Sequence, residues 1–260
     1  MGLSSKGEDI VNNYEENHHL QNLLEQCRNN LGERGFFQPF LELVKELKSV
    51  QIGIWSHKHD VPKCLFIRNL ENPIFGEVAK SIYMTGWYKQ DPLIDKLTAQ
   101  KKGTIEIVTH SQVKGLFSDE FLLAFASILQ SNNPLSGFAD RISILAALPD
   151  MPMIIHLYFQ KFEQVDLNHP LLPKLIELIT EHFPSAPQLN AVYQEAPHPA
   201  LSNLSDRERE VCIGILSGKK AERIAADMEV APSTVVTYRK RAYEKLGISS
   251  RASLFDLCGS

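Results

Sequence analysis

Small polar and cationic side chains lie on one helical face between residues 233 and 251. At about 100° per residue, that face carries Ser233, Thr237, Lys240 and Glu244, with Val236 and Arg241 beside it. The major groove of duplex DNA accepts one helix, and short polar or cationic side chains near the N-terminal end of that helix reach the base edges. The chemistry expected of this face is therefore hydrogen bonding to bases.

Further basic residues lie beside and beyond this face. The side chains of Arg239, Arg241, Lys245 and Arg251 suit the phosphates of a DNA backbone. The whole 260-residue chain has a net charge of −4, but residues 204–260 carry +2 and the remainder carries −6. Segment 238–251 holds five basic residues against one acidic residue. Positive charge is thus concentrated where a phosphate-facing element needs it.

The elements that would position these residues are three consecutive helices. Ser205 and Glu208 form the S-x-x-E pattern of a capping box, and Gly218 stands where a left-handed residue would end the first helix. A second short helix around Ile224 is followed by a break of about three residues, and Pro232 occupies the first turn of the third helix. The apolar side of the third helix must pack on the first two through Val235, Tyr238, Ala242 and Leu246. This layout predicts a helix-turn-helix rather than an isolated, solvated basic helix.

The segment LSDREREVCIGILSGKKAERIAADMEVAPSTVVTYRKRAYEKLGISSRASL resembles the LuxR-type helix-turn-helix. The matching residues are Leu204, Arg207, Glu208, Glu210, Val211, Gly218, Ile224, Ala225, Thr234, Val235, Lys245, Leu246, Gly247 and Arg251. The resemblance implies a double-stranded DNA partner and a homodimer that regulates transcription, with RNA polymerase as a further partner to be tested. It also places Val236 at a base-contact position beside Thr237 and Lys240. This sequence departs from the family pattern at Cys212, Ala231, Val236 and Tyr238, and Val236 can contact a thymine methyl group but cannot donate to guanine.

Four prolines in segment 184–203 predict an extended linker, because each removes a backbone donor and disfavours helix at the preceding residue. The predicted division is therefore a domain over residues 1–183, a linker over 184–203 and a DNA-binding domain over 204–260. In the first domain, about five strand-like segments alternate with helical ones. Among them, SVQIGIWS has the two-residue period of a half-buried strand and KCLFIRN is similar, apolar residues from Ile74 to Tyr83 recur at helical spacing, and residues 118–120 give a helix start. Strands joined by the short turn PDMP favour antiparallel pairing. The fold class expected is an α+β sensor sandwich of α/β/α type, followed by an all-α helix-turn-helix domain.

A second set of residues could bind a small-molecule effector. The block SIYMTGWYKQDPLIDKL resembles the aromatic stretch of acyl-homoserine-lactone sensors that ends in Asp-Pro, and the candidates are Trp55, Tyr83, Trp87, Tyr88 and Asp91. The resemblance implies that Asp91 accepts a hydrogen bond from a ligand amide. Three of the family's aromatic positions hold Val78, Ile82 and Glu106, so most of the lactone-binding set is missing. The alternative is that the aromatics pack in a core and Asp91 caps a helix that begins at Pro92.

Other kinds of function find little support in the residues. Cys27, Cys64, Cys212 and Cys258 form no CxxC pair, and His57, His59 and His110 lack carboxylates at ligand spacing, so we expect neither a metal site nor a cofactor. No apolar run is long enough for a membrane span, and the start of the chain lacks a secretion signal, which predicts a cytoplasmic protein. No phosphoacceptor receiver pattern and no catalytic motif is present. Three hypotheses remain: a ligand-gated regulator, a regulator whose first domain only dimerises or docks a protein, and an enzyme fused to a DNA reader.

Overall fold

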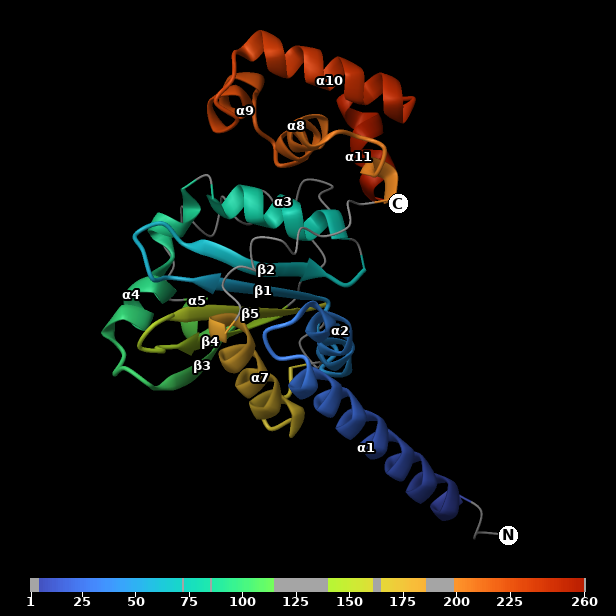
Figure 1. Cartoon of the computed structure of the whole chain (residues 1–260), viewed down its shortest axis with the longest axis vertical. Coiled ribbons are helices and arrows are strands. Elements are labelled where there is room, and N and C mark those ends of the chain that lie inside the picture. The colour runs from blue at the N-terminus through green and yellow to red at the C-terminus, as the bar shows by residue number, and fades with distance from the viewer. Residues whose placement is uncertain are drawn as a thin grey trace.

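The computed structural model describes residues 5–71, 73–84, 86–114, 140–160, 165–185 and 199–259 (Figure 1). A five-stranded antiparallel sheet forms the centre of the N-terminal part, with strand order β2-β1-β5-β4-β3. The strands are β1 (Gln51–Ser56), β2 (Lys63–Asn69), β3 (Ile105–Thr109), β4 (Asp140–Ala146) and β5 (Met153–Phe159). The predicted strands and their antiparallel pairing are confirmed. The helix expected to begin at Ser118 to Glu120 lies outside the described residues.

Strand β1 is buried on both of its faces, although its alternating pattern predicted a half-buried strand. All six residues from Gln51 to Ser56 are buried. Ile52 and Ile54 enter the large apolar core, whereas Gln51, Gly53 and Trp55 point to the opposite face of the sheet. Helices cover both faces of the sheet, so the alternation along β1 indicates which layer each side chain enters. It does not indicate which side chains are exposed to solvent.

Helices α1 (Ser5–Asn29), α2 (Phe37–Glu46) and α7 (Leu171–Ser185) cover one face of the sheet, with the short 3₁₀ turn η1 (Arg34–Phe36) between the first two. The core between these helices and the sheet is aromatic. The rings of Phe36 and Phe40 stack with centroids 5.0 Å apart, and His182 stacks on Phe36 at 3.7 Å. The Nδ1 atom of His182 accepts a hydrogen bond from the Gly32 amide at 3.1 Å.

The other face of the sheet carries α3 (Pro73–Met84), the 3₁₀ turn η2 (Trp87–Gln90) and α4 (Pro92–Ala99), while the short α5 (His110–Lys114) follows β3. Leu93 and Leu97 of α4 pack with Leu145 and Ile154 of the sheet in a small apolar cluster. The N-terminal part is therefore a three-layer α/β/α arrangement, as expected. Among the described residues, no helix combines the length and apolar character needed to cross a bilayer.

Helix α7 continues two residues past the predicted end of the first domain. Pro184 lies inside its last turn, and the Ser185 hydroxyl donates to the carbonyl oxygens of Glu181 and His182, both at 2.9 Å. These bonds satisfy carbonyl groups at the helix end that would otherwise lack partners. The predicted linker over 184–203 thus begins within α7 and ends beyond a 3₁₀ turn, η6 (Pro199–Leu201).

The C-terminal part is wholly helical, as predicted. Its helices are α8 (Asp206–Leu216), α9 (Ala221–Asp227), α10 (Pro232–Leu246) and α11 (Arg251–Gly259). Its core contains Val211, Ile215, Ile224, Val235 and Leu254. Cys212 and Cys258 are also buried there as free thiols, and Cys27 is buried in the larger core, so these three act as apolar filling.

Candidate nucleic-acid interface

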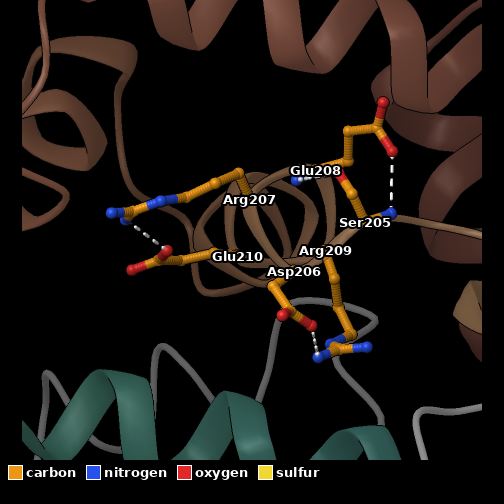
Figure 2. A network of polar contacts seen from close by, with 6 residues as sticks. All are labelled: Ser205, Asp206, Arg207, Glu208, Arg209 and Glu210. Atoms are coloured by element: carbon orange, nitrogen blue, oxygen red, sulfur yellow. Dashed lines mark hydrogen bonds and ion pairs between the residues drawn. The ribbon is translucent and has the colours of Figure 1, made fainter.

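A complete capping box opens α8, as the sequence predicted (Figure 2). The Ser205 hydroxyl accepts from the Glu208 amide at 3.4 Å, and the Ser205 amide donates to Glu208 Oε2 at 2.8 Å. Asp206 adds negative charge to the same first turn, which suits the positive end of the helix dipole. The side chains of Ser205, Asp206 and Glu208 therefore fix the start of α8.

Glu208 also ties α8 to the end of α10. Its Oε2 atom lies 2.7 Å from Lys245 Nζ, and its side chain is 5% exposed. The hydrogen bond from Lys245 comes first among the causes that lower the pKa of Glu208 to about 2, followed by the bond from the Ser205 amide. The carboxylate therefore stays ionised at neutral pH and joins the two ends of the motif.

Glycine allows α8 and α9 to approach closely. A Cβ atom on Gly214 would lie 2.8 Å from Ile224 Cγ1 of α9, so a side chain would force the helices to shift. Gly218 ends α8 with a φ of +77°, the left-handed geometry that its sequence position predicted. These two glycines set the sharp bend between the first two helices.

The turn from α9 to α10 contains a strained residue. Glu229 has a φ of +54°, a left-handed conformation that is unfavourable for a residue with a Cβ atom. Pro232 occupies the first turn of α10, where its missing N–H costs nothing, and the Ala231 cap makes no side-chain hydrogen bond. The loss of a capping oxygen at Ala231, expected from the sequence, is confirmed.

Helix α10 has the two faces predicted from its sequence. Val235 and Ala242 are buried against the other helices, at 2% and 0% exposure, and Tyr238 and Leu246 pack half-buried on the same core. The four predicted base-contact residues are all exposed: Ser233, Val236, Thr237 and Lys240. Val236 is one of the large apolar side chains that the described surface leaves open, at 46% exposure. The structure therefore brings these four side chains together on one uncovered face.

The polar groups on this face keep most of their bonding capacity. The Thr237 hydroxyl donates to the Ser233 carbonyl at 3.0 Å, which leaves its oxygen able to accept. Lys240 Nζ lies 4.0 Å from Glu244 Oε1, and both side chains are largely exposed. An exposed pair at that distance is weak and can be exchanged for a base or a phosphate at little cost.

The four predicted phosphate contacts differ in their surroundings. Arg239 and Arg241 are exposed on α10. Arg251 is also exposed, with its guanidinium carbon 5.5 Å from the centre of the Phe255 ring. Lys245 is exposed but forms an ion pair with Glu208. This pair was not predicted from the sequence.

Residues 202–258 match the family model described as "Bacterial regulatory proteins, luxR family". These residues form a LuxR-type helix-turn-helix domain. The match spans α8 to α11 and the turns between them, and it includes all the residues predicted to contact DNA. We refer to residues 202–258 as the LuxR-type domain below.

The curated relatives share chiefly this domain. Two proteins named "Probable transcriptional regulatory protein NarL", from Mycobacterium tuberculosis strains CDC 1551 and ATCC 25618, are 53% identical over 55 residues, 21% of this chain and 26% of theirs. The "Putative HTH-type transcriptional regulator in exeN 3'region" of Aeromonas salmonicida is 32% identical over 136 residues, 52% of this chain and 64% of its own. The chain thus spans about a quarter of the NarL proteins and less than two thirds of the Aeromonas protein.

Two solved structures of SdiA resemble the chain over most of its length. A crystal structure of Escherichia coli SdiA has 16% sequence identity and a TM-score of 0.38, and covers 85% of this chain and 90% of that one. A structure of SdiA in complex with octanoyl-rac-glycerol has 14% identity and a TM-score of 0.34, covering 84% and 86%.

The candidate ligand-binding residues of the N-terminal part lie together, between the sheet and the segment formed by α3, η2 and α4. Tyr83 Oη donates to Asp91 Oδ2 at 2.9 Å, and the Tyr83 ring centre lies 4.7 Å from that of Trp55. The ring centres of Tyr88 and Tyr83 are 6.3 Å apart. Trp87 is half-buried and packs against two apolar clusters, the one that contains Val78 and the one that contains Leu93. Asp91 also caps α4, because its Oδ1 accepts from the Leu93 amide at 3.0 Å. The predicted cap is confirmed, and each carboxylate oxygen keeps a lone pair for a ligand donor.

Polar side chains of the sheet complete this cluster, and the sequence analysis missed them. Arg141 on β4 lies with its guanidinium carbon 6.0 Å from the Tyr158 ring centre. Ser143 Oγ and His156 Nδ1 are 2.9 Å apart. Polar residues alternate with isoleucine in β4, and this alternation was the available signal for a polar patch on the second face of the sheet.

Charge within this cluster is balanced between Asp91 and Arg141. Burial raises the pKa of Asp91, which is 6% exposed, whereas the positive charge of Arg141 and the bond from the Leu93 amide act to lower it. Burial likewise raises the pKa of Tyr83, so the phenol remains a donor. A ligand here would meet one acid, one guanidinium and several neutral donors.

The histidines considered for metal binding differ in burial. His59 is exposed and His110 is half-buried. His57 is half-buried, its Nε2 atom is buried, and burial lowers the pKa of the ring to about 4. Within the described part of the chain, no three histidine, cysteine or acidic side chains gather in a way that could hold a metal ion.

Proposed function

We propose that this chain is a transcription regulator that binds duplex DNA as a homodimer, with α10 of each copy in a major groove. The exposed face of Ser233, Val236, Thr237 and Lys240 carries this proposal, because it lies on the third helix of a LuxR-type domain. Arg239, Arg241 and Arg251 flank that face and can neutralise phosphates. A single helix-turn-helix gives limited specificity, so two half-sites read by a dimer are the expected target.

Selection of duplexes by the full chain tests this function. The protein is incubated with a random pool of double-stranded DNA, and bound molecules are amplified and sequenced over several rounds. We expect enrichment of a sequence with two related half-sites about one helical turn apart, or a multiple of it. A pool that stays random after selection at low salt contradicts the proposal.

We further propose that the N-terminal part senses a small molecule at the cluster around Asp91. The support is a buried carboxylate beside Arg141, Tyr83 and Trp55, which together offer an acceptor, a cation and aromatic surface. Such a mixture of apolar surface and a few placed polar groups is typical of ligand sites. The alternative, in which the N-terminal part only dimerises or docks a protein, assigns Asp91 the single role of capping α4.

Native mass spectrometry of the purified chain tests for a retained ligand, and thermal unfolding tests its effect. A ligand identified in this way should raise the melting temperature of the protein in proportion to the logarithm of its concentration. The Asp91→Ala variant should lose this response while still binding DNA, whereas Asp91→Asn should keep the helix cap and isolate the role of the charge. A normal ligand response in Asp91→Ala would remove this residue from the site.

A further inference from the structure

Helix α3 carries an apolar stripe on the side turned away from the sheet. Ile74, Val78 and Ile82 recur every four residues and therefore share one helical face. They are 3%, 4% and 8% exposed, and they belong to the same apolar cluster as the core of the LuxR-type domain. Figure 1 shows α8 lying over α3, on the side opposite to the sheet. The stripe is therefore buried by the LuxR-type domain.

The opposite face of α3 lies directly on β2. A Cβ atom on Gly76 would lie 3.4 Å from the Asn69 amide nitrogen and 3.7 Å from the Arg68 backbone. Gly76 is about 160° around the helix from Val78. One face of α3 thus belongs to the N-terminal part, and the other contacts the DNA-binding part.

The matching surface of α8 surrounds Ile213. This side chain is half-buried and packs against the shared apolar cluster. By helical angle it lies between Asp206 and Arg209, and Figure 2 shows both of those residues pointing away from Glu208, toward the side where α3 lies. The Arg209 side chain is 22% exposed, although arginine on a helix surface is ordinarily open to water.

The sheet-facing side of α3 also reaches the polar cluster around Asp91, because Tyr83 lies two turns beyond Gly76 on nearly the same face. Tyr83, next to the stripe residue Ile82, donates to Asp91 and contacts the Trp55 ring. One rigid twelve-residue helix therefore contacts both the candidate ligand site and the LuxR-type domain. A displacement of this helix at one contact must alter its packing at the other.

We propose that α3 is a reversible docking element. Its stripe holds the LuxR-type domain through α8, and the hydrogen bond between Tyr83 and Asp91 sets the position of the helix and hence the strength of the docking. Packed interfaces switch between discrete arrangements and do not deform continuously. A docked domain has one fixed orientation, whereas a dimer on DNA needs its two α10 helices at a set spacing. Docking thus biases DNA binding, and this last step alone rests on the proposed function.

Charge placed in the interface tests the docking itself. Val78→Asp acts from the α3 side, and Ile213→Asp acts independently from the α8 side. The matched control is Lys80→Gln, which makes the same change of charge at a position of α3 whose side chain is 42% exposed. The radius of gyration of each full-length protein is measured by small-angle X-ray scattering, and hydrogen exchange is followed in α3 and α8.

We expect both aspartate variants to enlarge the radius of gyration and speed exchange in α3 and α8, with the control unchanged. Because the two substitutions lie in different domains, a folding failure in one leaves the other to decide. A wild-type radius and wild-type exchange in the folded aspartate variant would overturn the proposal.

Tyr83→Phe tests the coupling, since it removes one hydroxyl that does not face α8. We expect faster exchange in α8 and a change in DNA dissociation constant in the same direction as Val78→Asp, by about fivefold or more. Unchanged exchange in α8, or a change of affinity in the opposite direction, would overturn it. If no variant and no wild-type protein binds DNA, the proposed function fails, while scattering and exchange still decide the docking.

Discussion

Lys240 and Arg239 are neighbours in sequence, but they stand at different angles on α10. Lys240 lies on the proposed base-reading face, and Arg239 lies beside it. We expect Lys240→Ala to cost about 1–3 kcal/mol of binding free energy at particular base pairs and to relax preference there. Arg239→Ala should weaken binding to every sequence and reduce the salt slope by about one unit. Affinities for a panel of single-base operator variants, measured at several salt concentrations, separate the two effects. An unchanged operator preference in Lys240→Ala would show that the assignment of the helix face is wrong.

Lys245 combines a predicted phosphate contact with a structural ion pair. Its removal leaves the nearly buried Glu208 carboxylate with one partner fewer. Lys245→Ala should therefore lower the free energy of unfolding of the LuxR-type domain by about 1 kcal/mol, in addition to weakening DNA binding. Thermal unfolding of the free protein measures this loss, and Arg239→Ala, which is exposed on the same helix, serves as the control. Equal melting temperatures for the two variants would contradict the structural role.

Residue types and spacing predicted the exposed face of α10 because a helix converts spacing directly into a face. Ser233, Val236, Thr237 and Lys240 needed no tertiary information beyond the apolar side of α10. The partners of Lys245 and Asp91 were different cases. Glu208 is thirty-seven positions from Lys245, and Arg141 reaches the neighbourhood of Asp91 only through strand pairing. Contacts that depend on tertiary packing leave no spacing rule in the sequence.

At the scale of elements, the turn between α9 and α10 offers a test of local strain. Glu229→Gly should raise the free energy of unfolding by about 0.5–1 kcal/mol. The strain that a left-handed φ imposes on a residue with a Cβ atom is removed, and this gain is larger than the loss of stability caused by the greater flexibility of glycine in the unfolded chain. Ala226→Gly, at an exposed position of α9, is the matched control and should cost about 1 kcal/mol. Chemical denaturation of both variants measures the two changes. A loss of stability in Glu229→Gly would mean that the turn adopts another conformation.

Elements with a local signal were predicted closely, and those governed by their surroundings were not. Strand β2 has the bounds read from its sequence, and the cap, glycine and proline signals placed α8 and α10. The prediction that β1 is half-buried was wrong, because helices cover both faces of the sheet. The end of α7 moved past Pro184 because Ser185 satisfies the last carbonyl groups. In each case a tertiary or side-chain partner outweighed the local pattern.

For the whole molecule, acid should destabilise the N-terminal part before the LuxR-type domain. Burial lowers the pKa values of His57 and His182 to about 4, and that of His156 well below its ordinary value. The unfolded chain binds these protons near pH 6.5, so their stabilising contribution is complete above that pH and is lost as the pH falls toward 4, by about 1.4 kcal/mol per pH unit per proton. Asp91 acts in the opposite direction, because its raised pKa means that the folded protein holds this proton more readily than the unfolded chain does. The contribution of Glu208 persists above pH 4.5 and is lost as the pH falls toward 2.

Calorimetry of the full chain between pH 7 and pH 5 checks this order, with hydrogen exchange to assign each transition to its domain. The melting temperature of the N-terminal transition should fall and that of the LuxR-type transition should stay nearly constant. His182→Phe should make the first dependence shallower. Melting of the LuxR-type domain first, or two transitions that are insensitive over this range, would contradict the assignment of neutral buried histidines.

The relation between the two domains was beyond the sequence for a physical reason. The apolar stripe of α3 was predicted as an ordinary amphipathic helix, and such a stripe does not say which surface covers it. Its partner, α8, lies more than one hundred residues further along the chain. The three-layer arrangement of the N-terminal part and the helices α8 to α10 could each be predicted separately, whereas their contact had to come from the structure.

The central claim, that α10 docks in duplex DNA, is tested most directly by the salt dependence of binding by the full chain. Fluorescence anisotropy with a labelled duplex from the selection gives the association constant at each salt concentration. We predict that the logarithm of this constant falls linearly with the logarithm of salt concentration, with a slope of about −0.9 for each phosphate contacted. We also predict that Val236→Glu, which places an acid on the exposed face, abolishes binding without unfolding the domain. Absence of duplex binding at low salt, or an affinity that ignores both salt and this substitution, would contradict the account.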